Sequence, residues 1–206
     1  MNHNLKIKKS TVPTRKKLIS AALKLFVKKG YYGTSISDIS KATKLSKAAI
    51  YFHFKNKDAL LKSILEEYER IFMDRMIEEV ESRSGEVIEK FTCLLRFVLN
   101  FPIKNREICL FLVNLSTELF DDKKKYEREI NGIYKKYYNF FSGLLEKGKE
   151  EGLIGKNYNL RILTLILIGL LEGNLLQWNM NRNSINSEQY SRSFMKFFLN
   201  GILKSN

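Results

Sequence analysis

Residues 45–61, with the sequence LSKAAIYFHFKNKDALL, place small, aromatic and cationic side chains in one short segment. Ser46 is suited to cap a helix, and Ala48 and Ala49 follow it in the expected first turn. Small residues there let the backbone of a helix approach a surface closely. The major groove of B-DNA is about 12 Å wide and admits one helix, whose N-terminal turns contact the bases. The segment therefore predicts a helix that enters a DNA groove.

The side chains around this helix divide into candidate base readers, candidate phosphate ligands and core residues. Lys47 has the length to reach a base edge or a phosphate. Ser46, Thr34 and Ser35 lie at predicted helix N-termini, where backbone N–H groups bind phosphate oxygens. The predicted phosphate donors that follow are Tyr51, His53, Lys55 and Lys57. The residues expected in the core of the small domain are Ile50, Phe52 and Phe54.

The charge of the chain is distributed unevenly. The 206 residues carry a net charge of +14. Residues 1–62 hold fifteen Lys and Arg and two Asp and Glu, a net +13, whereas residues 63–206 hold 21 and 20. This asymmetry predicts a polyanion-binding domain over residues 1–62, joined to a nearly neutral domain over residues 63–206. The charge alone does not decide between nucleic acid and an anionic membrane surface.

The apolar pattern predicts an all-α protein of about nine helices, because apolar residues recur at the helical period and no alternating strand pattern is present. The first helix is expected to start at Pro13 and to end at Gly30. Later helices are expected over about 58–80, 87–102, 106–120, from DDKKK to EEGLIG, 160–180 and 190–202. The run ILTLILIGLL is too short for the roughly 20 apolar residues of a membrane span, so it predicts a buried helix.

Two short helices lie between the first and the longer fourth helix. Thr34 or Ser35 is expected to cap one, residues 43–45 to form a turn, and Ser46 to cap the other, which runs to about His53. So tight a connection predicts a helix-turn-helix unit braced by the first helix. An amphipathic helix with a solvated basic face is the alternative for residues 45–61. This alternative would require two helix caps, a short turn and a run of basic residues after the second helix to occur together by chance.

The segment TSISDISKATKLSKAAIYFHFKNKDALL, Thr34 to Leu61, resembles the DNA-binding signature of the TetR family of bacterial repressors, roughly T-x-x-x-I-A-x-x-A-G-V-S-x-G-x-x-Y-x-[HY]-F-x-x-K-x-x-L. The preceding helix and the layout of helices over the chain are also similar to that family. By position, the resemblance implies that Thr34 and Ser35 anchor the second helix to phosphate, and that His53 and Lys57 clamp the DNA backbone. It implies that the groove is faced by Lys47, Ala48, Ala49 and Tyr51.

Two positions depart from the family signature. Lys44 stands where the family has its turn glycine, and a non-glycine residue in the left-handed conformation costs about 1 kcal/mol or more. Ala48 stands where the family often has glycine, and its extra methyl group limits the approach of the backbone slightly. The operator sequence therefore does not transfer from relatives.

The helix over residues 160–180 is apolar almost all round, so both of its faces must be buried, one of them against a partner. The resemblance implies that it pairs, with the last helix, in a four-helix dimer interface. The residues predicted there are Ile162, Ile166, Leu170, Tyr190, Phe194, Phe197 and Phe198. A two-fold dimer would place two reading helices roughly 34 Å apart and require a palindromic operator. The alternative is that both helices belong to the core.

A ligand pocket in the second domain rests mainly on the resemblance, because each candidate residue also fits a core or an interface. The apolar candidates are Phe72, Met76, Leu95, Phe111, Tyr137, Phe141 and Trp178. The polar candidates are Asn114, Thr117, Glu172, Asn174 and Gln177. Family members release DNA when a small apolar or amphipathic molecule enters this region, so the resemblance implies an effector such as an acyl-CoA or a drug-like compound. The fourth helix would couple the two domains.

The sequence argues against an enzyme, and it indicates neither a cofactor nor a metal site. The two histidines are His3 and His53, and no Cys and His cluster, phosphate loop or Ser-His-Asp arrangement appears. Cys93 and Cys109 are expected to be buried thiols, as in the cytoplasm of a bacterium or archaeon. Two rivals to a sequence-specific regulator remain: an architectural DNA-binding protein that is blind to sequence, and a basic membrane-surface protein.

Overall fold

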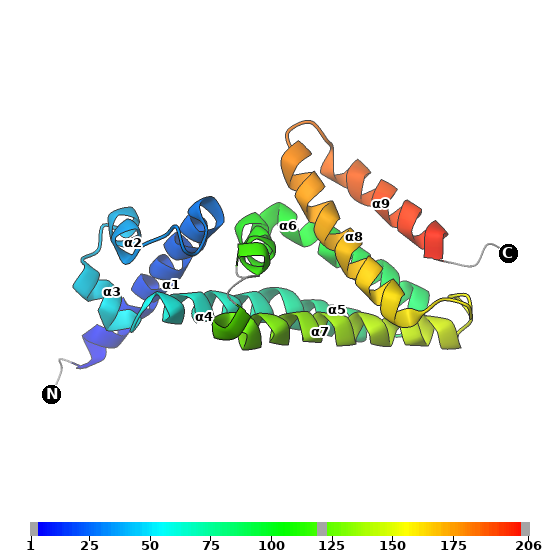
Figure 1. Ribbon diagram of the computed structural model, residues 1–206, viewed down its shortest axis with the longest axis horizontal. Helices are drawn as coiled ribbons and strands as arrows, with labels where there is room; N and C mark the ends of the chain where they lie inside the picture. Colours follow the sequence, from blue (N-terminus) through cyan, green and yellow to red (C-terminus); the bar gives the residue numbers. More distant parts are fainter. Residues whose placement is uncertain (1–3, 119–122, 203–206) are drawn as a thin grey trace. The chain divides into compact units, whose positions relative to one another are not determined.

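The computed structural model describes residues 4–118 and 123–202, and these form helices α1 to α9 with one π-helical segment, η1 (Figure 1). No strand occurs in these two ranges, which confirms the all-α prediction. The chain divides into two compact units, which are not contiguous in sequence. Unit 1 comprises residues 1–68 and 110–129, and unit 2 comprises residues 69–109 and 130–206. The predicted boundary after residue 62 did not anticipate that residues 110–129 group with the N-terminal unit.

Unit 1 is built on α1 (Asn4–Lys29), α2 (Ile36–Thr43), α3 (Lys47–His53) and α4 (Lys57–Tyr68). Its core contains Leu18, Phe26 and Ile39, with Ile50 of α3 fully buried against them. The C-terminal end of α6 adds Phe111, whose ring stacks on Phe26 at 6.2 Å between centroids. Phe111 is therefore a core residue of unit 1, although the sequence analysis grouped it with ligand candidates of the second domain.

Helix α1 begins earlier than the sequence predicts. Pro13 lies inside α1 rather than at its first turn, although proline lacks the N–H that would continue the helical ladder. The side chains of the basic arm, Lys6, Lys8 and Lys9, lie outside the residues whose side chains the structure describes. Gly30 ends the helix with a φ of +77°, as predicted for a glycine at this position.

Unit 2 contains η1 (Glu69–Asp74), α5 (Arg75–Glu81), most of α6 (Val87–Glu118) and of α7 (Lys123–Glu150), α8 (Leu160–Asn181) and α9 (Ser187–Ile202). The predicted break between residues 102 and 106 appears as a kink in α6 at Asn105, where φ is −127°. Helices α8 and α9 are joined by a short connection and form a hairpin (Figure 1).

A cluster of aromatic rings fills the interior of unit 2. Phe72 contacts Phe97, Phe101 and Tyr137 at centroid distances of 5.7, 5.0 and 5.9 Å, and Tyr137 contacts Phe141 at 5.4 Å. Met76 and Leu95 are fully buried. A cavity of about 10 Å³ lies beside α8, lined in part by Asn174, Trp178 and Tyr190, and it has room for about one water molecule. Of the predicted apolar ligand residues, Phe72, Tyr137 and Phe141 thus pack in one aromatic cluster, Met76 and Leu95 are buried, and Trp178 is half-buried beside the cavity.

Candidate nucleic-acid interface

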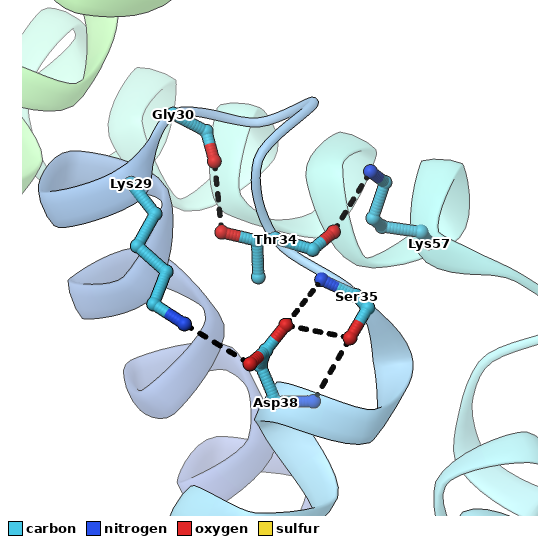
Figure 2. Close-up of polar contacts among 6 residues, drawn as sticks. All are labelled: Lys29, Gly30, Thr34, Ser35, Asp38 and Lys57. Carbon is cyan, nitrogen blue, oxygen red and sulfur yellow. Dashed lines mark hydrogen bonds and ion pairs between the residues drawn. The ribbon is translucent and has the colours of Figure 1, made fainter.

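The local hydrogen bonds of the α2–α3 region explain why this sequence folds as a helix-turn-helix. Ser35 caps α2: its hydroxyl accepts from the Asp38 backbone N–H at 3.1 Å, and the Asp38 carboxylate accepts from the Ser35 backbone N–H at 2.9 Å (Figure 2). This reciprocal pair is a capping box. Ser46 caps α3 in the same sense, because its hydroxyl accepts from the Ala49 N–H at 3.1 Å. Both caps confirm the sequence prediction.

Asp38 is held in its ionised form. Hydrogen bonds from Ser35, followed by the ammonium group of Lys29 at 3.0 Å, hold the pKa of the Asp38 carboxyl well below its usual range. A carboxyl whose folded-state pKa is lowered stabilises the fold above the usual aspartate pKa of about 3.9. That contribution is lost only as the pH falls from there toward the lowered value.

The turn between α2 and α3 is closed by Lys44 in the left-handed conformation. Its φ and ψ are 57° and 32°, and it has the only positive φ of a non-glycine residue in the described part of the chain. The Ser40 hydroxyl donates to the Leu45 carbonyl at 2.6 Å across the turn. The prediction that Lys44 occupies the glycine position of the turn is thus confirmed, and its side chain is exposed.

Helix α3 exposes one face and buries the other. Successive residues of a helix are 100° apart, so Lys47, Ala48, Tyr51 and Phe52 fall on one arc, which we call the reading face. All four are exposed, and Tyr51 retains 52% of its side-chain accessibility. Ile50 on the opposite side is fully buried, and Phe54 is 4% exposed. Ala49 and His53 are half-buried and lie outside the arc of the reading face.

Phe52 contradicts the prediction that it belongs to the core, because 71% of it is exposed. The reason is helical geometry: Ile50 and Phe54 satisfy the core side, and Phe52 lies one turn after Ala48 on the solvent side. Its ring contacts only the edge of His53 among the ring contacts described, at 5.3 Å. Phe52 is the member of the reading face that the sequence analysis missed.

Thr34 and Lys57 both make hydrogen bonds within the α1–α2 connection. Thr34 is 1% exposed, and its hydroxyl donates to the Gly30 carbonyl at 2.8 Å (Figure 2). The Lys57 ammonium donates to the Tyr31 and Thr34 carbonyls at 2.8 and 2.9 Å and lies 4.2 Å from the centre of the Tyr31 ring. These side chains fix the α1–α2 connection. Burial removes the Thr34 hydroxyl from contact with phosphate, whereas the phosphate role of the half-buried Lys57 stays a prediction.

The same connection is held by a carboxylate far away in sequence. Glu118 of α6 accepts from the backbone N–H groups of Tyr31 and Tyr32, both at 2.7 Å. The Tyr31 hydroxyl also donates to Asp58. Nothing in the sequence pattern links Glu118 to this connection, because 87 residues separate it from Tyr31. The remaining predicted DNA ligands, Ser35, Ser46 and Lys55, are exposed.

The predicted dimer-interface residues of unit 2 differ in how far they are exposed. Ile162, Ile166, Leu170 and Phe197 are exposed, as a partner surface requires, whereas Phe198 is 4% exposed and stacks on Phe194 within its own protomer. Phe198 is therefore corrected to a core residue. Tyr190 is half-buried and accepts from the Asn174 amide at 3.3 Å. Helix α8 is also long and apolar enough, by length and composition alone, to cross a membrane. Of its 18-residue apolar stretch, 17% is buried within the protein.

Glu172 is the charged residue among the predicted polar ligand candidates. Burial raises the pKa of this carboxyl, and the Tyr134 hydroxyl donates to it at 2.9 Å. Gln177 is exposed. Asn114 and Thr117 lie on the part of α6 that belongs to unit 1, and Thr117 donates to the backbone of its own helix. The predicted polar set is therefore divided between the two units, and its role in ligand binding stays a prediction. Within the described residues, no group of three or more His, Cys, Asp or Glu is placed to hold a metal ion.

A basic helix-turn-helix with an exposed reading face defines a DNA-binding regulator of transcription, and comparison with known proteins identifies its family. Residues 18–64 match the model for bacterial regulatory proteins of the tetR family, and residues 65–201 match the model for the C-terminal region of YsiA-like proteins. The chain belongs to the TetR family of transcriptional regulators.

Relatives resemble the chain over nearly its whole length. The fatty acid metabolism regulator protein of Bacillus subtilis (strain 168) is 26% identical over 196 residues, 92% of this chain and 96% of that protein. The HTH-type transcriptional repressor DhaR of Mycobacterium sp. (strain GP1) is 23% identical over 86% of this chain and 88% of its own.

Solved structures share the fold. The MbdR regulator from Azoarcus sp. CIB has a TM-score of 0.82 at 25% identity, covering 92% of this chain and 98% of that one. FadR from Bacillus subtilis in complex with stearoyl-CoA has a TM-score of 0.73 at 23% identity, covering 91% and 98%.

Proposed function

We propose that the protein is a homodimeric repressor that binds a palindromic DNA operator through α3. A small hydrophobic or amphipathic effector, an acyl-CoA or a drug-like compound, would bind unit 2 and release the DNA. The observation that carries this proposal is the reading face of α3, where Lys47, Ala48 and Tyr51 are exposed while Ile50 anchors the helix from behind. A cationic, small-residue helix face is what a DNA groove accepts.

The apolar face of α8 supports the dimer. Its exposed positions recur along one side of the helix and include Ile162, Leu165, Ile166 and Leu170, with Gly169 and Gly173 between and beyond them. A Cβ atom added at either glycine would meet nothing within 4 Å in the protomer. A second copy of the helix can therefore approach closely at the glycines and cover the apolar residues. A two-fold pair would present two α3 helices to half-sites about 34 Å apart.

The interior of unit 2 supports a hydrophobic effector. Its aromatic cluster, together with Met76 and Leu95, offers an apolar environment, and Glu172 with Tyr134 adds a polar group beside it in unit 2. The B. subtilis relatives, a fatty acid metabolism regulator by name and a FadR with bound stearoyl-CoA, favour a fatty acyl-CoA. The cavity of about 10 Å³ beside α8 has room for about one water molecule, so an effector at that place requires the surrounding side chains to move. Such a ligand shifts the equilibrium because it binds the DNA-incompetent state more tightly.

Selection of genome fragments with the purified protein, at a fixed salt concentration near the physiological 0.15 M, tests this function. The expected result is a palindromic sequence whose enrichment disappears with Tyr51→Ala. Acyl-CoA added to the recovered complex is expected to release the DNA. Enrichment of no sequence would contradict the proposal and favour an architectural DNA-binding protein. Binding to anionic vesicles that Tyr51→Ala leaves unchanged would favour a membrane-surface protein.

A further inference from the structure

Phe52 is the largest exposed apolar side chain of the reading face. At 71% exposure it is more accessible than Tyr51, and it has no hydroxyl with which to bind water or phosphate. A partner that covers this benzyl side chain removes apolar surface from water, which favours binding.

The position of Phe52 limits what that partner can be. Phe52 lies one turn after Ala48, whose methyl group leaves the space above the helix open, and it is followed by the exposed Lys55. Lys47 and Lys44 are also exposed near the start of α3, and residues 1–62 carry a net +13. A polyanion fits this charge, and the partner must also offer an apolar group.

One chemical group of a DNA duplex meets both conditions. In the major groove each base pair presents hydrogen-bond donors and acceptors, and the C5-methyl group of thymine is the apolar feature among them. A phenyl ring recognises this methyl group by contact alone. Phosphate and sugar contacts, by contrast, carry no sequence information directly.

We propose that Phe52 is a specificity-determining residue whose ring contacts the C5-methyl group of a thymine in each operator half-site. The inference rests on the proposed function, because it assumes that α3 lies in the major groove of a specific duplex. The contact of Phe52 adds a preference for thymine that Lys47 and Tyr51 alone do not give.

Replacing each thymine of the recovered operator with deoxyuridine, one position at a time, tests the inference, because only the methyl group is removed. With the wild-type protein, one symmetric pair of replacements is expected to raise Kd about three- to tenfold, at or below the lower end of what one methylene contributes in a hydrophobic pocket. With Phe52→Ala, the same replacements are expected to leave Kd unchanged.

Tyr158→Ala is the matched control, because Tyr158 is an aromatic residue at 47% exposure that lies outside both the reading face and the predicted dimer interface. This variant is expected to retain the dependence on the thymine methyl, whatever its overall affinity. Equal effects of deoxyuridine on the wild type and on Phe52→Ala, or no effect at any position, would overturn the inference while the operator itself upholds the proposed function. Failure to recover any operator would overturn both.

Discussion

Helices α3 and α8 both expose apolar side chains, yet their surroundings differ. On α3, Tyr51 and Phe52 are flanked by lysines on a helix of seven residues. On α8, Ile162, Leu165 and Ile166 begin a long uncharged stripe interrupted by glycines, on a helix of 22 residues. Exposure of apolar groups alone does not identify a partner. The surrounding charge and the length of the surface indicate DNA for the first and a second copy of the chain for the second.

The strongest way to break this comparison is to enlarge the glycine face of α8. Gly169→Leu adds a side chain into open space, so the protomer should fold normally or gain helix stability. The added side chain would separate the two copies. Because a monomer binds only one half-site at a time, operator binding should weaken by about 100-fold or more. Sedimentation equilibrium and titration of the operator measure both effects.

Gly132→Leu on α7 is the control, since Gly132 is also exposed with nothing within 4 Å of an added Cβ. It should leave the dimer and operator binding intact. A Gly169→Leu protein that stays dimeric would show that α8 does not form the interface.

The second prediction concerns the carboxylate that holds the α1–α2 connection. Glu118→Ala leaves the N–H groups of Tyr31 and Tyr32 without their acceptor, so the free energy of unfolding should fall by about 2 kcal/mol. Gly30→Ala should act similarly, because its Cβ would lie 2.8 Å from a Glu118 oxygen and its φ is +77°. Chemical denaturation measures both variants. Dimerisation should be unaffected. An unchanged free energy of unfolding for Glu118→Ala would contradict the claim that Glu118 stabilises the α1–α2 connection.

The third prediction separates folding from DNA binding at one residue. Lys44→Gly relieves the left-handed conformation of the turn, so Tm should rise by about 2–4 °C for a chain of this size. The loss of the exposed charge should reduce the salt dependence of DNA binding by about one unit if Lys44 neutralises one phosphate. Lys44→Asn is the control that removes the charge but tolerates the conformation. No rise in Tm would refute the strain.

The smallest effect is expected at the surface of unit 2. Lys136 pairs with Asp74 at 2.7 Å and with Glu69 at 3.9 Å, at the two ends of η1. Because these groups are partly exposed, Lys136→Met should lower stability by about 0.2–1 kcal/mol, and less at high salt. Urea denaturation at two salt concentrations checks this. A larger loss would indicate that η1 depends on this pair.

The sequence predicted best those features that are determined by neighbouring residues. Ser35, Ser46 and Lys44 act on backbone groups within a few positions, so caps and turn follow from residue type. The burial of Ile50 and Phe54 follows from helical spacing. The kink at Asn105 was also anticipated by the break after Pro102.

Most of the failures arose from tertiary structure. Thr34 has the residue type of a phosphate ligand, but its hydroxyl is buried and donates to the Gly30 carbonyl. Phe111 could not be assigned to unit 1 without knowing that the end of α6 packs on Phe26. Phe52 had a local signal that was misjudged: two positions after a core isoleucine, a helical residue points away from the core.

The most direct test of the account is the ratio of Kd values for the recovered operator and for a scrambled duplex of the same length, measured with the wild type and Tyr51→Ala at one salt concentration. The account predicts a wild-type preference for the operator of about 10³ or more. Tyr51→Ala should lose most of this preference while its binding to the scrambled duplex stays nearly constant. A wild-type ratio close to one, or a ratio that Tyr51→Ala does not change, would contradict the claim that the reading face of α3 recognises sequence.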